Sequence, residues 1–415
     1  MNRPGLFTAF GIELEYMLVD RATLAVRPAA DEALRLAAGS ETYVSDAACG
    51  PMTWSNELVA HVLELKVEPP AASLLGLAPA FQAEIQAMNA RLAPLNLRLL
   101  PGAMHPLMRP AAETKLWPHD YAEIYAAFHR IFDCHTHGWA NLQSVHLNLP
   151  FAGEREFARL HAAVRAVLPL LPALAASSPI QEGRATGLLD TRLENYRHHM
   201  DRVPAATGRV IPEPVYTEAE YRTRVFAPMF AEIAPFDTEG LLQEEFLNAR
   251  GAIARFDRGS VEVRLLDVQE CPLADLAICE LVQRTVRALC EERWMPLARL
   301  QAWPVDRLHA LLLDTLRDAD RARVDDAELL EAFGCGGAGL LHAGEIWARL
   351  FEALWPAAPA HAPEPERSAL DRILKRGPLA RRILAATGPQ PHPQRIVEVY
   401  AQLAEALERG RLFLP

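Results

Sequence analysis

The sequence is poor in lysine, and this shapes what the chain can bind. Lysine occurs only at Lys66, Lys115 and Lys375, so arginine carries nearly all of the positive charge. With 42 basic and 53 acidic residues, the formal net charge is −11. Such a charge argues against nucleic acid or an anionic membrane as the main partner. An anionic substrate would have to be held locally, by a metal ion or by a few arginines.

Cysteine pairs, long apolar runs and a P-loop are also missing. The six cysteines are scattered without C-x-x-C spacing, which favours reduced thiols over a disulfide framework or a zinc site. No apolar run reaches the roughly 18 residues that span a bilayer, and no basic-then-apolar signal pattern opens the chain. We therefore expect a cytoplasmic protein with no membrane partner. There is no Walker A pattern, so any ATP would be held without a P-loop.

What the chain does have is length and hydrophobic content. At 415 residues, half of them hydrophobic, it can form a large core in two or three domains or in one elaborated domain. Strand and helix patterns interleave up to about residue 300, and the pattern is helical from there on. We divide the chain into residues 1–300 and a helical region at 301–415, in which the Pro/Ala-rich stretch 355–365 is the clearest linker.

The periodicity predicts individual elements in chain order. Strands are expected at 10–20, 55–69 (one strand or a bent pair), 95–100, 143–150 and 259–268. Helices are expected at 28–38, 71–93, 119–137, 154–174, 217–233, 239–249, 272–294, 305–320, 325–333, 338–354, 366–386 and 392–409.

Four of these strands carry charged or polar side chains opposite their aliphatic residues. In the first strand, alternation places Glu13 and Glu15 on one face. Their Cα atoms would lie roughly 7 Å apart, so both carboxylates could reach one polyvalent cation or two adjacent ones. The corresponding polar faces of the three later strands present Glu64, then His146 and Asn148, then Glu262 and Arg264.

If the four strands are neighbours in one sheet, their polar faces form a single cluster. Four carboxylates packed this closely would repel one another and raise one another's pKa values, and a cation would relieve this. Oxygen-rich sites suit Mg²⁺ or Mn²⁺ better than zinc, and divalent cations beside an arginine serve phosphoryl transfer. The alternative is a polar sheet face that is solvated or paired with arginines of covering helices.

Six short motifs in a fixed order resemble the glutamate–cysteine ligase family, including its branch of carboxylate–amine ligases of unassigned substrate. They are residues 10–16 (FGIELEY), 62–65 (VLEL), 101–106 (PGAMHP), 145–148 (VHLN), 176–179 (ASSP) and 261–267 (VEVRLLD). The resemblance implies an α+β fold related to the catalytic domain of glutamine synthetase, with a curved antiparallel sheet at the active site and helices outside. It also implies ATP- and Mg²⁺-dependent amide formation through an acyl phosphate, with Mn²⁺ as the alternative metal.

The resemblance extends to individual residues. The positions that match the family's metal site are Glu13, Glu15, Glu64, His146 and Glu262. Arg264 matches an arginine near the transferred phosphate, so Arg264, Glu262 and His146 are the catalytic candidates. His146 is an unusual ligand for Mg²⁺ and would serve equally as a hydrogen-bond donor to phosphate. Arg192 and Tyr196 match substrate-side positions, with looser spacing.

Other residues are assigned from the chain itself. Asn148, on the polar strand face, and His105, between a glycine turn and Pro106, are further candidates for substrate binding. His135 and His137 are interpreted as helix-end residues, and His198 and His199 as surface or substrate-loop residues, in preference to metal ligands.

The resemblance leaves the substrates open. It fades after about residue 300, and no pattern marks a cysteine-binding pocket. The expected partners are a small-molecule acid and an amine, and a homodimer is compatible with the sequence. The competing hypotheses are a phosphotransferase with a stable phosphorylated product and a non-catalytic nucleotide or amino-acid sensor.

Overall fold

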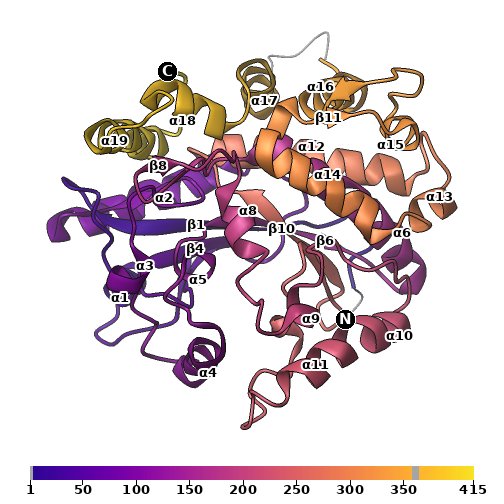
Figure 1. Ribbon diagram of the computed structural model, residues 1–415. Coiled ribbons are helices and arrows are strands. Elements are labelled where there is room, and N and C mark those ends of the chain that lie inside the picture. Colours follow the sequence, from indigo (N-terminus) through magenta and orange to yellow (C-terminus); the bar gives the residue numbers. More distant parts are fainter. Residues whose placement is uncertain (1–2, 358–363) are drawn as a thin grey trace.

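The computed structural model describes residues 3–357 and 364–415 and centres on one eight-stranded antiparallel sheet (Figure 1). The strand order is β2-β3-β4-β1-β6-β10-β9, and β5 also pairs with β1. The strands are β1 (Gly11–Asp20), β2 (Asp46–Cys49), β3 (Met52–Asn56), β4 (Val62–Val67), β5 (Leu97–Leu100), β6 (Ser144–Pro150), β9 (Ala252–Arg255) and β10 (Ser260–Asp267). Helices surround this sheet, which confirms the predicted α+β fold class.

Helices account for most of the remaining chain. They are α1 (Ala30–Ala38), α2 (Ala78–Leu92), α3 (Pro110–Glu113), α4 (Ala122–Phe132), α5 (His137–Ala140), α6 (Glu154–Val167), α7 (Pro172–Ala175), α8 (Thr191–Tyr196), α9 (Pro204–Thr207), α10 (Glu218–Tyr221), α11 (Ala227–Ile233), α12 (Pro272–Cys290), α13 (Leu297–Gln301), α14 (Val305–Asp318), α15 (Ala327–Ala332), α16 (Ala343–Leu354), α17 (Pro365–Arg376), α18 (Leu379–Thr387) and α19 (Pro393–Arg409). Two short hairpins, β7 (Ile180–Gln181) with β8 (Arg184–Ala185) and β11 (Arg323–Val324) with β12 (Leu341–His342), lie outside the main sheet.

Strand alternation places the core on one face of the sheet. Ile12, Leu14 and Tyr16 of β1 are fully buried in the largest hydrophobic cluster, together with the aliphatic residues of β4, β6 and β10. Helix α12 is the central helix of this core, since it contacts β6 as well as α2, α6, α16 and α17. It begins at Pro272, as predicted, because proline tolerates the first helical turn. On the opposite face Met17 and Val19 of β1 pack in a second hydrophobic cluster with residues of α18 and α19, and polar residues occupy the rest of that face.

Two helix predictions are wrong in ways that local chemistry explains. The helix expected at 239–249 is absent except for a 3₁₀ turn at Glu245–Leu247. The buried carboxylate of Asp237 accepts hydrogen bonds from the backbone N–H groups of Leu241 and Leu242, at 3.0 and 2.8 Å, and so replaces helical bonding. The helix expected at 366–386 breaks into α17 and α18 at Gly377, which has φ +84° and is followed by proline.

The strand predictions need smaller corrections. The 55–69 segment is a bent pair, because β3 ends at Asn56 and β4 begins at Val62. Strands β2 and β9 were not predicted, since each has only four residues, two of them alanine, and so shows no clear alternation.

Helices α14, α16 and α17 share the main core, whereas α18 and α19 pack mostly in the second hydrophobic cluster. Leu308, Ile346 and Leu370 belong to the same hydrophobic cluster as the β1 residues, and Figure 1 shows α16 to α19 along the side of the molecule remote from α4 and α11. The division at residue 300 therefore stays a prediction. Of the predicted linker, residues 358–363 lie outside the described part of the chain. Among the described helices none is both long and apolar enough to cross a membrane.

Candidate active site

The four polar strands are neighbours in the order β4-β1-β6-β10, which is the arrangement that the clustered site requires. The register places Glu15 opposite Glu64 and Glu13 opposite His146. On the next pair of strands Asn148 is opposite Glu262. The polar side chains therefore form one continuous row across the open face of the sheet.

At the centre of this row an imidazole is hydrogen-bonded to a carboxylate. His146 Nδ1 lies 3.0 Å from Glu13 Oε2, and Asn148 Nδ2 donates to Glu13 Oε1 at 3.1 Å. Burial would raise the pKa of Glu13, but the hydrogen bond and the charge of His146 lower it to about 2. Gly11 makes room here, because a Cβ at this position would lie 3.0 Å from Asn148 Cβ. Glu13 is thus held ionised by its contact with His146.

The next carboxylate is fixed by the backbone. Glu15 Oε2 accepts hydrogen bonds from the Ser144 N–H at 2.6 Å and from its hydroxyl at 3.1 Å. The same hydroxyl lies 2.9 Å from His146 Nε2. Although burial and Arg264 lower the pKa of His146, its hydrogen bond to Glu13 and the charges of Glu15 and Glu13 raise it overall. Ser144 therefore links two predicted metal-site residues.

The pKa values of two carboxylates near this row, Glu64 and Glu57, are raised. Glu64 Oε1 accepts a hydrogen bond from Ser55 Oγ at 3.0 Å, and burial, followed by the charges of Glu13 and Glu57, raises its pKa well above 4.5. Burial and the charge of Glu15 raise the pKa of Glu57 to about 7. A divalent cation bound here would displace these protons, because it favours the ionised carboxylates.

The donor set fits divalent cations. Two groups of three residues, Glu13–Glu64–His146 and Glu15–Glu57–Glu64, each offer ligand atoms within 4.8 Å of one another. Five of these six ligand positions are carboxylates, which suits Mg²⁺ or Mn²⁺. Because Glu64 belongs to both groups, the cluster has the form of two adjacent sites with a bridging carboxylate.

Glu262, predicted as a ligand, lies beside these groups rather than within them. Its carboxylate is 3.9 Å from His146 Nδ1, 2.9 Å from Arg264 Nη1 and 3.5 Å from Arg255 Nη1. A register shift between Val263 and Leu266 breaks the β10–β6 pairing beside Arg264. Such bulges redirect side chains. The Nε of Arg264 is buried and has no hydrogen-bond partner among the described residues.

The two predicted substrate-side residues of α8 reach the same region. Arg192 is buried and its Nε donates a hydrogen bond to Asp267 Oδ1, which holds the guanidinium in place. Tyr196 is 7% exposed, and within the described chain its hydroxyl has no hydrogen-bond partner. Asp190 caps α8 by accepting a hydrogen bond from the Leu193 N–H at 2.9 Å. The helix thus presents an anchored arginine and an unpaired hydroxyl.

His105 is not brought to the cluster. Its Nε2 lies 2.7 Å from the Leu24 carbonyl oxygen, and its Nδ1 accepts a hydrogen bond from the Leu107 N–H. Both ring nitrogens are therefore engaged within the protein, and burial lowers the pKa of this histidine. We do not include it in the proposed site.

Two cavities lie along the polar row. The first, of about 590 Å³, includes Glu15, Arg192 and Tyr196 in its wall, and the second, of about 600 Å³, includes Glu13 and Glu64. The residues common to both walls are Glu57, His146, Arg255, Arg258 and Arg264. Glu57, His146 and the three arginines thus form a partition between the two cavities, with Glu15 on one side and Glu13 and Glu64 on the other.

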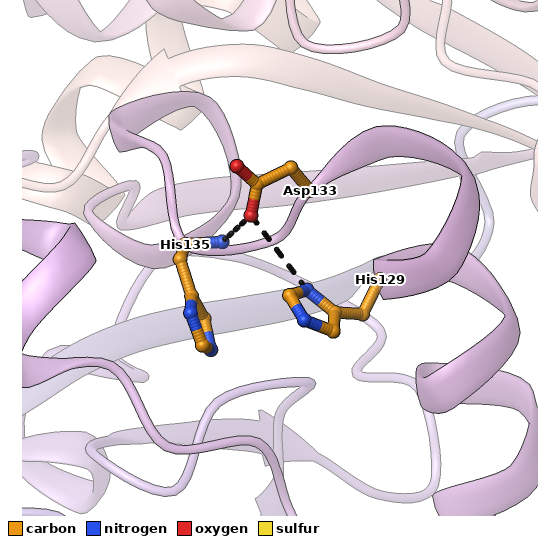
Figure 2. A group of neighbouring side chains, drawn as sticks. All are labelled: His129, Asp133 and His135. Carbon is orange, nitrogen blue, oxygen red and sulfur yellow. Dashed lines mark hydrogen bonds and ion pairs between the residues drawn. The ribbon is translucent and has the colours of Figure 1, made fainter.

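A separate histidine cluster follows α4, shown in Figure 2. His129 Nδ1 lies 3.8 Å from Asp133 Oδ1, which also accepts a hydrogen bond from the His135 N–H at 3.2 Å. The Cys134 N–H donates to His129 Nδ1 at 3.1 Å. These are contacts of a helix end, and the group lines neither of the two cavities.

His137 and Glu182, 3.2 Å apart, and His198 line another hollow of about 870 Å³. His199 lines this hollow and also the 590 Å³ cavity.

Sequence reasoning missed Glu57, Ser144, Arg255 and Arg258. Alternation does place Ser144 on the face of His146, and Glu57 continues the Ser55 face of β3 past the strand's end. These two could have been found. Arg255 and Arg258 could not, because β9 and its turn carry no recognisable pattern.

Comparison with known proteins gives the family. The family model of glutamate–cysteine ligase family 2 matches residues 9–402. An uncharacterized protein of Archaeoglobus fulgidus is 31% identical over 391 residues, which cover 93% of this chain and 95% of that protein. A candidate glutamate–cysteine ligase 2-3 of Rubrobacter xylanophilus is 34% identical over 190 residues, 44% of this chain and 46% of its own.

A solved structure shows the same fold. The glutamate–cysteine ligase of Francisella tularensis, in complex with AMP, superposes with a TM-score of 0.59 at 13% identity. The superposition covers 98% of this chain and 90% of that one. With the match of the family model to almost the whole sequence, the chain belongs to glutamate–cysteine ligase family 2, and this membership supports an ATP-dependent ligase.

Proposed function

We propose that the protein is an ATP- and Mg²⁺-dependent carboxylate–amine ligase that forms an amide of the γ-glutamyl type through an acyl phosphate. The observation that carries this proposal is the pair of carboxylate groups sharing Glu64, set beside Arg264 on the partition between two cavities. A reaction that transfers a phosphoryl group from ATP to a second substrate needs a charged centre that both can reach. The family membership supports the same reaction class.

Charge distinguishes the two cavities. The 600 Å³ cavity is lined by five carboxylates, those of Glu13, Glu57, Glu64, Glu68 and Glu262, and by four basic residues, Lys66, Arg255, Arg258 and Arg264, so its wall carries an excess of acidic groups. The 590 Å³ cavity is lined by only two carboxylates, Glu15 and Glu57, and by four arginines, Arg192, Arg255, Arg258 and Arg264. We assign the metal–nucleotide complex to the first cavity and the acid substrate to the second, because carboxylates hold the metal ions and arginines hold an anionic substrate.

The residues of the partition have distinct tasks in the proposed reaction. Bound Mg²⁺ would neutralise phosphate charge and polarise the γ-phosphate. Arg264 has a free Nε and a guanidinium next to the ligands, so it is placed to stabilise the charge of the transferring phosphoryl group. Glu262 orients Arg264, and Ser144 and Asn148 orient the carboxylates of Glu15 and Glu13.

The proposed reaction has two steps, phosphorylation of the acid and attack by the amine. A carboxylate oxygen of the acid attacks the γ-phosphorus of ATP and ADP leaves, which gives an acyl phosphate. The amine nitrogen then attacks the acyl carbon, phosphate leaves and the amine loses a proton. Arg192 and the Tyr196 hydroxyl are assigned to the acid, since both line its cavity. Under this proposal the partners of the protein are small molecules, an acid and an amine, in the cytoplasm.

The test is the substrate requirement for ADP release. The protein is incubated with ATP, Mg²⁺ and a panel of amino acids and amines, and products are identified by mass spectrometry. We expect ADP only when acid and amine are both present, with a product whose mass is their sum minus one water. Release of ADP with one substrate and accumulation of a stable phosphorylated product would identify a phosphotransferase. Nucleotide binding without turnover for any pair would favour a sensor.

A further inference from the structure

The acid cavity is also partly apolar. Five aromatic residues line it, from the segments around α4 and α5 and from the 3₁₀ turn before β9: Tyr121, Tyr125, Phe128, Trp139 and Phe246. Three of these rings contact one another, since Phe128 lies 5.2 Å from Trp139 and 6.1 Å from Phe246 between ring centroids. The charged partition, with Arg264 and His146, belongs to the same cavity. The wall of the cavity therefore combines charged groups with a cluster of aromatic rings.

Two of the three polar ring groups of this aromatic wall, those of Trp139 and Tyr125, make hydrogen bonds within the protein. Trp139 Nε1 donates to the His199 carbonyl oxygen at 3.0 Å, and the Tyr125 hydroxyl accepts a hydrogen bond from Asn56 Nδ2 at 3.2 Å. What these rings offer a ligand is then apolar surface and the negative faces of their π systems, which attract cations.

Two rings of the wall are exposed to solvent. Tyr121 is 61% exposed and Phe246 is 42% exposed. Only six large hydrophobic residues are this exposed in the described part of the chain, and two of them meet at this one cavity. Exposed apolar area costs about 25 cal/mol per Å², and clustered exposed apolar residues mark binding sites.

The volume suits two substrates side by side. A cavity of about 590 Å³ is of the size that holds drug-sized ligands, which is more than one small amino acid fills. With an acid held at the arginines, the aromatic wall is left for the second substrate of the proposed ligase. That substrate is an amine, and a protonated amine is a cation.

We propose that the amine substrate carries an aromatic or similarly apolar body that packs on the wall formed by Tyr121, Tyr125, Phe128, Trp139 and Phe246. Assigning this ligand as the amine rests on the proposed ligase function. The preference for a ring over a short polar chain rests on the cavity alone. A short polar acceptor such as cysteine would leave the exposed rings without a partner.

The test compares two amines that differ only by a ring. Binding of 2-phenylethylamine and of ethylamine to the wild-type protein is measured by calorimetry, with and without a non-hydrolysable ATP analogue and glutamate. We expect at least tenfold tighter binding of 2-phenylethylamine, with a negative heat-capacity change. Equal affinity for the two amines would overturn the proposal.

Variants locate the effect. Phe246→Ala and Tyr121→Ala should each reduce the affinity difference at least threefold without affecting ethylamine. Tyr43→Ala, which removes a 53% exposed tyrosine outside the cavity, is the matched control and should change nothing. If the difference survives in both cavity variants, the ring binds elsewhere and the proposal is wrong. Because no turnover is needed, a failure of amide formation would sink the ligase proposal and leave this one standing.

Discussion

At the scale of single residues, the site depends on how neighbouring carboxylates divide protons and charge among themselves. Glu13 is kept ionised by His146, whereas burial and mutual repulsion raise the pKa values of Glu57 and Glu64. Such an arrangement costs folding free energy unless a cation compensates it. We therefore expect the residues of the row to affect metal binding and activity more than they affect folding.

The first prediction concerns Glu262→Gln. The variant keeps the shape of the side chain but removes the charge that orients Arg264. Mg²⁺-dependent turnover should fall at least about 100-fold, since one electrostatic contact to a transition state is typically worth this much. Circular dichroism should show an intact fold. Glu398→Gln, at an exposed ion pair, is the control. Full activity of Glu262→Gln would refute the site.

The second prediction concerns the bridging carboxylate. Mg²⁺ or Mn²⁺ should raise the melting temperature of the wild-type protein, because ligands that bind only the folded state stabilise it. Glu64→Gln removes a ligand from both carboxylate groups, so it should abolish most of this shift. Manganese binding can be followed directly by electron paramagnetic resonance. Unchanged manganese affinity in Glu64→Gln would place the metal elsewhere.

The third prediction concerns His161 and acid stability. Burial and the charge of Arg165 lower the pKa of His161 to about 3, against 6.5 for an exposed histidine. Between these values the unfolded chain binds the proton and the folded chain does not, so stability is lost as the pH falls from about 6.5 toward 3. His161→Phe should make the free energy of unfolding less dependent on pH from 6 to 4. The free energy of unfolding is measured by urea titration at each pH. If it varies with pH equally in the variant and in the wild type, this assignment is wrong.

At the scale of elements, the packing of α5 on α8 positions the substrate-side residues. Gly138 of α5 packs closely against α8 and the turn after it. A Cβ at this position would lie 2.7 Å from His199 Cβ and 2.8 Å from the Asn195 carbonyl oxygen, so there is no room for a side chain. This approach holds the helix that carries Arg192 and Tyr196. A change at the contact should therefore be felt in the cavity.

The fourth prediction is that Gly138→Ala separates the two helices. We expect a loss of about 1–3 kcal/mol in the free energy of unfolding, as is typical of overpacking. The KM for the acid should rise, because Arg192 and Tyr196 move with α8. Gly336→Ala, where the nearest atom is 3.7 Å from the added Cβ, serves as the control. A variant as stable as the wild type with an unchanged KM would show that α5 and α8 are not coupled.

At the scale of the whole molecule, the C-terminal helices are joined to residues 1–300 by a buried ion pair. Arg382 of α18 pairs with Glu270, and these side chains are 3% and 0% exposed. Arg382 also donates to the Phe413 carbonyl oxygen at 2.7 Å, and Glu270 accepts a hydrogen bond from the Phe413 N–H. The contact connects α18, the chain end and the segment that follows β10.

The fifth prediction uses this contact to test the division at residue 300. Arg382→Met leaves Glu270 buried without its partner, so the free energy of unfolding should fall by about 3–5 kcal/mol. Because both regions share one core, we expect a single calorimetric transition in the variant as well as in the wild type. Arg395→Met, at an exposed pair, is the control. Two separate transitions would show that 301–415 is an independent domain.

The sequence by itself determined which residues face the core and which face the site. Alternation in β1, β4, β6 and β10 assigned every polar residue of the row to the correct face, because a period of two leaves only two choices. It could not determine register, and a slip by one residue would have separated Glu13 from His146. The sequence pattern also predicted a helix at 239–249, where the Asp237 carboxylate instead accepts a backbone hydrogen bond.

Only the tertiary structure decided which residues meet. Arg255 enters the site because β9 pairs with β10, which brings its guanidinium to Glu262. His105 lies within the family motif at 101–106, yet its ring is turned to the Leu24 carbonyl oxygen. Local patterns report how a side chain relates to its own strand. Contacts between distant segments depend on how strands pair and where loops turn, and these are set by packing of the whole core.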